Sequence, residues 1–222
     1  MMFCQLSIFS LLLSAAPTFG SPVDKRQAKT PVSDSFFNIL VRYGNFAAAS
    51  IFQPCNVPPD DSVVVQYIVN HITDTHATLF RVDSAKELIF SLGGSSSIQD
   101  FITDFTFFPV PYSGCTGCQA HVGFYKAWQS IQNDSMSALD NAVAANPDFK
   151  ITIVGHSLGG ALASLAYAGL VSSGNYPQIS AAWSYGEPRV GNQAYADYVD
   201  KLSGSTDAHV GNFYRVTHAN GE

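Results

Sequence analysis

Charged residues are scarce in this sequence, and positive ones are scarcer than negative ones. Of 222 residues, 13% are charged, with 11 Lys and Arg against 17 Asp and Glu, which gives a formal net charge of −6. A nucleic-acid-binding surface needs a basic face, so we expect no nucleic-acid partner. Low charge together with 46% hydrophobic residues also excludes a disordered chain and a coiled coil, and it allows one domain with a sizeable core.

The apolar run near the N-terminus is too short to cross a bilayer as a helix. It spans eleven residues from Leu6 to Ala16 and ends in small residues, which is typical of a secretion signal, although no Lys or Arg precedes it. We predict a signal peptide over residues 1–20, no permanent membrane anchor and an extracellular location. Residues 21–32 then form a loose pro-segment with a dibasic processing site at Lys25-Arg26.

Cysteine is also rare, and the number of cysteines outside the predicted signal peptide is odd, which is unusual in an oxidising compartment. Cys4 lies in the predicted signal peptide, which leaves Cys55, Cys115 and Cys118. The spacing of Cys115 and Cys118 is compatible with a redox or metal half-site and with a local disulfide across a tight turn. The disulfide is favoured, because no second cysteine pair accompanies the first. Cys55 is then left without a partner in this sequence.

Strand-like and helix-like segments alternate along the rest of the chain. Strands are predicted at residues 63–69, 78–82, 88–92, 151–154, 181–185 and 213–216, and helices at 33–50, 122–145, 158–171 and 193–202. This alternation predicts an α/β layer fold with a largely parallel sheet. We place it in one domain over residues 33–222.

The most informative segment is Gly155-His156-Ser157-Leu158-Gly159. A G-x-S-x-G match alone is weak, but an apolar strand precedes this one and a helix of small residues follows, as a nucleophile elbow requires. A sharp turn frees the serine hydroxyl and crowds the positions two before and two after it, where glycine has no Cβ to clash. The turn also aims the Leu158 N–H at a developing oxyanion. An ordinary strand–helix turn is the alternative, and His156 is expected to be a packing residue.

Three further segments accompany the elbow in a recognisable order. They are Cys115-Thr116-Gly117-Cys118 followed by His121-Val122-Gly123-Phe124, then Gly186-Glu187-Pro188-Arg189-Val190-Gly191-Asn192, and Tyr214-Arg215-Val216-Thr217-His218-Ala219-Asn220. Together with the elbow, they resemble the fungal class 3 lipases, the filamentous-fungal triacylglycerol lipase and feruloyl esterase group. The resemblance implies an α/β-hydrolase fold, with a mostly parallel sheet flanked by helices, and ester hydrolysis through an acyl-enzyme.

The resemblance also implies roles for individual residues. Ser157 is the nucleophile, and the Leu158 backbone is one oxyanion donor. The second donor falls on Ser95, because residues 90–95 match the family's oxyanion loop. Gly93 departs from the pattern, since the family usually has an Arg there, and a less rigid loop is the expected cost. Cys115 and Cys118 match the family's short disulfide turn.

Residues 97–105 resemble the family's short lid helix. Ile98, Phe101, Ile102 and Phe105 share one face at helical spacing, and polar residues take the other face. We interpret the apolar face as part of a lid that opens at a lipid–water interface. A plain amphipathic helix fixed on the core is the alternative.

The family pattern breaks near the end of the printed sequence. The family's catalytic Asp would fall at Gly221, and the His that should follow it has no counterpart before Glu222. We do not expect His209 or His218 to replace it, so the C-terminal stretch with the triad acid and base is expected to be missing and the chain to have little activity. A non-catalytic lipase-like protein that binds acyl lipids is the second hypothesis, and a serine peptidase is the third.

We expect a monomer that acts on an acylglycerol or another ester, with no metal and no cofactor. His71 and His76 are interpreted as solvated polar residues, because no further ligands accompany them at metal-site spacing. Asn133 begins a glycosylation sequon on a predicted helix. Tyr112 and the Phe107-Phe108 pair are expected in the core or in a pocket wall.

Overall fold

The computed structural model describes residues 31–51, 55, 57–93, 108–206 and 208–217. Contacts divide the chain into two units, Met1–Ser33 and Asp34–Glu222. The fold described here is that of the second unit. The predicted signal peptide and the dibasic site at Lys25-Arg26 lie outside the described residues, and they stay predictions.

A six-stranded sheet forms the centre of the second unit. In sheet order its strands are β1 (Val63–Asn70), β2 (Thr75–Val82), β3 (Glu87–Gly93), β6 (Lys150–His156), β7 (Ile179–Tyr185) and β8 (Phe213–Val216). The pairs from β1 to β3 are antiparallel, and the pairs from β3 to β8 are parallel. The predicted α/β fold with a mostly parallel sheet is therefore confirmed.

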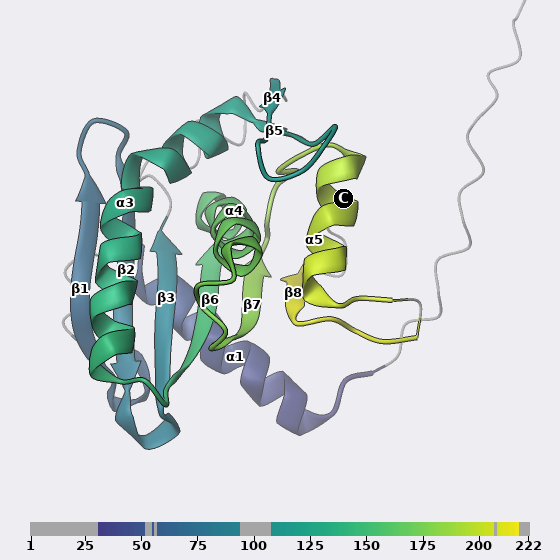
Figure 1. Cartoon of the computed structure of the whole chain (residues 1–222). Helices are drawn as coiled ribbons and strands as arrows, with labels where there is room; N and C mark the ends of the chain where they lie inside the picture. Colours follow the sequence, from purple (N-terminus) through teal and green to yellow (C-terminus); the bar gives the residue numbers. More distant parts are fainter. Residues whose placement is uncertain (1–30, 52–54, 56, 94–107, 207, 218–222) are drawn as a thin grey trace, which may run out of the picture. The chain divides into compact units, whose positions relative to one another are not determined.

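Helices cover both faces of this sheet (Figure 1). On one face lie α3 (Val122–Ala145), α4 (Leu158–Ser173) and α5 (Gln193–Ser203), and on the other lies α1 (Asp34–Ala49). Short 3₁₀ turns occupy Pro59–Asp61 and Asp83–Ala85. Within the described residues, no helix combines the length and the apolar character that crossing a membrane requires.

The helix after the elbow, α4, is buried on nearly all sides. Every residue from Leu158 to Ala168 is buried, and most of them are Ala, Gly or Leu. Small side chains let the helix pack closely on β3, β6 and β7, because they keep its backbone near the sheet. The first residue of α4 is therefore held firmly at the centre of the domain.

A second, two-stranded sheet pairs β4 (Pro109–Pro111) with β5 (Gln119–His121). The sequence carries no clear signal for it, because each strand has only 3 residues and two prolines in β4 mask any strand pattern. The turn between these strands contains the Cys115–Cys118 disulfide, which is the favoured of the two uses considered for this cysteine pair.

A buried carboxylate joins α1 to the amino ends of β3 and β6. Glu87 is 0% exposed and accepts hydrogen bonds from Tyr43 Oη (2.7 Å), Arg42 Nη1 (2.8 Å) and Thr152 Oγ1 (2.5 Å). Burial alone would raise the pKa of this carboxyl, but the hydrogen bonds and the Arg42 charge outweigh burial and lower its pKa. The ionised group therefore fixes α1 against the sheet.

Candidate active site

Ser157 lies between the end of β6 and the start of α4. Its backbone has φ 53° and ψ −120°, a conformation that a residue other than glycine adopts only where its surroundings impose it. Two hydrogen bonds hold the turn: Ser157 N donates to Tyr185 O (2.8 Å), and Ala161 N donates to Ser157 O (3.1 Å). Ser157 is 8% exposed, so it is fixed in place at the carboxyl end of the parallel strands.

The two glycines of the elbow lie where a larger residue would clash. A Cβ on Gly155 would lie 2.0 Å from Gly159 O, and a Cβ on Gly159 would lie 2.1 Å from Leu92 O. These are the crowded positions that the sequence analysis expected on either side of the serine. The second contact also places the first turn of α4 directly against the end of β3.

The N-terminus of α4 presents a backbone donor beside Ser157. Leu158 is the first residue of the helix, and the first N–H groups of any helix have no acceptor within it. Together with the helix dipole, such a group stabilises a negative charge placed next to it. The second predicted donor, Ser95, and the lid residues Ile98, Phe101 and Ile102 lie outside the described residues.

Gly93, at the end of β3, has no room for a side chain. A Cβ there would lie 2.1 Å from His76 Nε2 and 2.7 Å from Ser50 O. The His76 imidazole therefore fills the space beside the residue that departs from the family pattern. His71 is exposed, as expected for a solvated residue, whereas His76 is only half-exposed: its Nε2 is buried, and burial lowers the pKa of the ring.

Asn192 connects two of the motifs that are far apart in sequence. Its side-chain Oδ1 accepts from Gln119 N (3.1 Å) and from Tyr195 N (3.0 Å), and its Nδ2 donates to Gly117 O (2.9 Å). One amide thus caps α5 and ties it to the disulfide turn. His121 N also donates to Val190 O (2.7 Å), so the segment after β7 is fastened to the start of α3.

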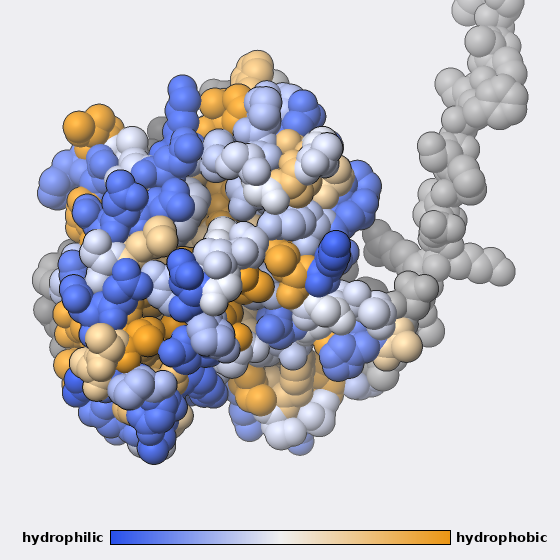
Figure 2. Space-filling model, in the orientation of Figure 1, coloured by the Kyte–Doolittle hydropathy of each residue, from blue (hydrophilic) through white to orange (hydrophobic). Residues whose placement is uncertain are grey.

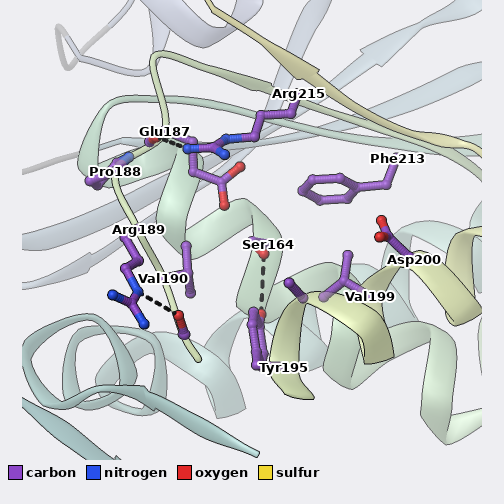
Figure 3. Close-up of a pocket in the computed structure, with 12 residues that line it drawn as sticks. Ser164, Glu187, Pro188, Arg189, Val190, Tyr195, Val199, Asp200, Phe213 and Arg215 are labelled. Carbon is purple, nitrogen blue, oxygen red and sulfur yellow. Dashed lines mark hydrogen bonds between the residues drawn. The ribbon is translucent and has the colours of Figure 1, made fainter. Parts of the chain in front are cut away.

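A cavity of about 610 Å³ opens among α4, α5, β8 and the segment after β7, and none of the elbow residues lines it (Figure 3). Glu187 points into it toward Ser164, and its carboxyl accepts a hydrogen bond from Ser184 Oγ. Ser164 Oγ and Tyr195 Oη share a hydrogen bond of 3.1 Å on the cavity floor. Arg215 Nη2 donates to Glu187 O (2.9 Å) at the edge of the cavity.

Burial raises the pKa of Glu187 to about 7, against the opposing effects of the Ser184 hydrogen bond and the Arg215 charge. At neutral pH the group therefore exchanges between an acid, which donates a hydrogen bond, and a carboxylate, which only accepts. Glu187 was named above only as part of its motif, without a role of its own. The signal that could have found it is an acidic side chain between Gly186 and Pro188, directly after a buried strand.

Other side chains refine or correct the sequence-based expectations. His156 is exposed rather than packed, and Phe108 is 62% exposed rather than buried. Tyr112 is buried as expected. Asn133 is exposed on α3, whereas Ser135, the third residue of its sequon, is fully buried, so its glycosylation stays a prediction.

The sequence of the second unit matches a known family over most of its length. Residues 89–220 match the family described as lipase (class 3), and this segment is more than half of the chain. The chain belongs to the class 3 lipase family. The recognition made from the elbow and its three accompanying segments is therefore confirmed.

Three relatives show how far this likeness extends. The secreted mono- and diacylglycerol lipase 1 of Fusarium solani is 35% identical over 163 residues, which cover 73% of this chain and 46% of that protein. The secreted mono- and diacylglycerol lipase A of Penicillium cyclopium is 30% identical over 234 residues, covering 97% of this chain and 73% of that protein. A solved triacylglycerol lipase, whose catalytic centre is described as a serine protease triad, has a TM-score of 0.74 at 29% identity, over 84% of this chain and 72% of that one.

This chain thus spans about half the length of the Fusarium relative and about three quarters of the Penicillium relative. The shared part contains both the elbow and the residues that line the cavity, because the family match runs from Ile89 to Asn220. The likeness to the solved lipase extends over most of the second unit and supports the α/β-hydrolase fold.

The close contact at Gly159 predicts a site-specific cost for a single methyl group. Gly159→Ala should lower the free energy of unfolding by about 2–3 kcal/mol, because the new Cβ meets the Leu92 carbonyl in a packed core. Gly169→Ala, on the same helix, should raise it by about 0.5–1 kcal/mol, because nothing lies within 4 Å of that Cβ. Urea unfolding followed by circular dichroism measures both, and equal effects would contradict the elbow packing described here.

The raised pKa of Glu187 predicts how stability changes with pH. The folded-state pKa of about 7 at Glu187 lies above the ordinary value of 4.5, so the folded protein holds this proton more tightly than the unfolded chain does. The stabilisation that comes from this tighter proton binding is complete below pH 4.5 and is lost as the pH rises toward 7. Glu187→Gln removes this titration, so its thermal midpoint should fall less than that of the wild type between about pH 5 and 8.

Val199→Ala, which removes no titratable group from the same cavity, is the control for this comparison. Its thermal midpoints should lie below the wild-type curve and run parallel to it across the same pH series. If the Glu187→Gln curve also runs parallel to that of the wild type, Glu187 does not hold its proton in the way described.

Proposed function

We propose that this protein is a secreted carboxylic ester hydrolase that acts on acylglycerols through the hydroxyl of Ser157. The observation that carries this proposal is the backbone of Ser157, which is held in a strained conformation between a parallel strand and a buried helix. The names of the Fusarium and Penicillium relatives, secreted mono- and diacylglycerol lipases, support the substrate class and the location. The serine triad described for the solved lipase supports the chemistry.

In the proposed reaction, Ser157 Oγ attacks the ester carbonyl carbon and gives up its proton to a general base. The tetrahedral oxyanion binds to the Leu158 N–H and to Ser95, which we propose as the second donor. The carbon–oxygen bond to the alcohol then breaks, and the alcohol leaves with the proton. Water attacks the resulting acyl-enzyme by the same route and releases the fatty acid.

Among the histidines of the described residues, we propose none as the general base. His209 lies in the loop that precedes β8, where Thr206 N donates to His209 O (2.9 Å). Because β6, β7 and β8 run parallel, this loop lies at the amino end of the strands, opposite Ser157. His209 is therefore badly placed to take the Ser157 proton, as the sequence analysis expected.

We further propose that the protein works as a monomer at a lipid–water interface and that residues 97–105 form its lid. The apolar face of that segment, with Ile98, Phe101 and Ile102, supports this role. A non-catalytic protein that binds acyl lipids without hydrolysing them is the competing function. The experiment on Ser157 separates the two.

Ser157→Ala should remove any release of fatty acid from tributyrin that the wild type shows above the uncatalysed rate, because the nucleophile is lost. Ser172→Ala, which changes an exposed serine at the far end of α4, should leave the rate unchanged. Titration of released acid measures both variants against the wild type. Vesicle binding by a wild type that releases no acid would support the non-catalytic binder, and full activity of Ser157→Ala would show that another group is the nucleophile.

A further inference from the structure

The hairpin between β1 and β2 presents an isoleucine that packing does not use. Ile72 lies in the turn formed by residues 71–74 and is 96% exposed, the highest value among the exposed large hydrophobic side chains of the described part. Burial of such a side chain normally stabilises a folded protein by about 1.5–3 kcal/mol. The exposed Ile72 does not make this contribution. A polar residue would satisfy the turn equally well.

Hydrogen bonds hold the backbone that carries Ile72 in place. Asn70 Oδ1 accepts from Ile72 N (3.0 Å) and Thr73 N (3.2 Å), and Asn70 Nδ2 donates to Ser130 O on α3 (3.0 Å). The hydroxyls of Thr73 and Ser130 share a further hydrogen bond of 2.7 Å. Because these hydrogen bonds fix the turn both to itself and to α3, they reduce the loop entropy that is lost when the side chain at its tip binds.

The register of the sheet places this tip at the same end as Ser157. Val69 pairs with His76, and His76 pairs with Gly93. In the neighbouring pair of strands, Leu92 lies opposite Gly155, two residues before Ser157. The turn beyond Val69 therefore projects from the edge of the sheet at which the elbow lies, as the strand directions in Figure 1 also show.

A second exposed apolar side chain lies at the same end of the molecule. Phe108 is 62% exposed, and its carbonyl accepts from Val122 N (2.9 Å) at the first residue of α3. Ser130, which holds the hairpin, is eight residues further along α3, about 12 Å at the helical rise. Figure 2 shows apolar atoms both over the β1–β2 hairpin, at upper left, and close to β4, at the top.

We propose that Ile72 is an anchor that inserts into the surface of an acylglycerol-containing lipid layer, with Phe108 as a second contact. This proposal rests on the proposed function, which brings the Ser157 end of the sheet to a lipid substrate. Isolated apolar side chains suit a lipid layer, which surrounds each inserted group with acyl chains. They suit a protein partner poorly, because a stable interface needs a continuous area of about 800 Å² on each side.

Vesicles of phosphatidylcholine with dioleoylglycerol test the anchor. All variants carry Ser157→Ala, so that no lipid is consumed, and co-sedimentation gives the partition coefficient. Ile72→Ser should lower this coefficient about tenfold, the loss expected when roughly half of the transfer free energy of one isoleucine disappears. Ile72→Phe should keep the wild-type value or exceed it. Val210→Ser is the matched control, because Val210 is 70% exposed in the loop before β8, at the opposite end of the sheet.

An Ile72→Ser variant that binds as tightly as its parent would overturn the proposal, as would an equal loss with Val210→Ser. No binding by the parent protein would also overturn it. Thermal midpoints within a degree or two of the parent show that the variants fold. Acid release from tributyrin by the protein with Ser157 intact is a separate measurement, so failure of the proposed hydrolysis and failure of the anchor are distinguishable.

Discussion

The positive φ of Ser157 is the constraint on which the arrangement of this protein depends. One residue changes the chain from strand to helix, and the change is possible only because neither neighbouring glycine carries a Cβ. The contact between Gly159 and the Leu92 carbonyl then fixes how close α4 lies to β3. The strain at the serine is thus sustained by the packing of the whole central sheet.

The outer parts of the fold reinforce this centre from two sides. On one side, the Asn192 amide joins α5 to the disulfide turn and thereby positions the segment after β7. On the other, the Glu87 carboxylate holds α1 against the amino ends of β3 and β6. Both sets of hydrogen bonds satisfy polar groups that would otherwise be costly to bury. They leave the carboxyl ends of the parallel strands available for chemistry.

Much of the fold could be predicted because its signals are local. The periodic helix at Val122–Ala145 and the apolar strand before the elbow are recognisable within a few turns of sequence. Features that depend on contacts between distant segments were missed. The short pair β4 and β5 has no pattern of its own, and only the approach of Gly93 shows why His76 is partly buried. Glu187 was quoted within its motif, but nothing in the sequence shows the cavity around its carboxyl.

The most direct test of the central claim is to locate the reactive nucleophile chemically. The intact protein is incubated with an excess of an alkyl fluorophosphonate, digested, and sequenced by tandem mass spectrometry. The elbow geometry predicts one phosphonylated residue, Ser157, since its hydroxyl lies beside a helix N-terminus that stabilises the developing charge. An adduct on a different serine, or an unmodified Ser157 after prolonged incubation, would contradict the assignment of this residue as the nucleophile.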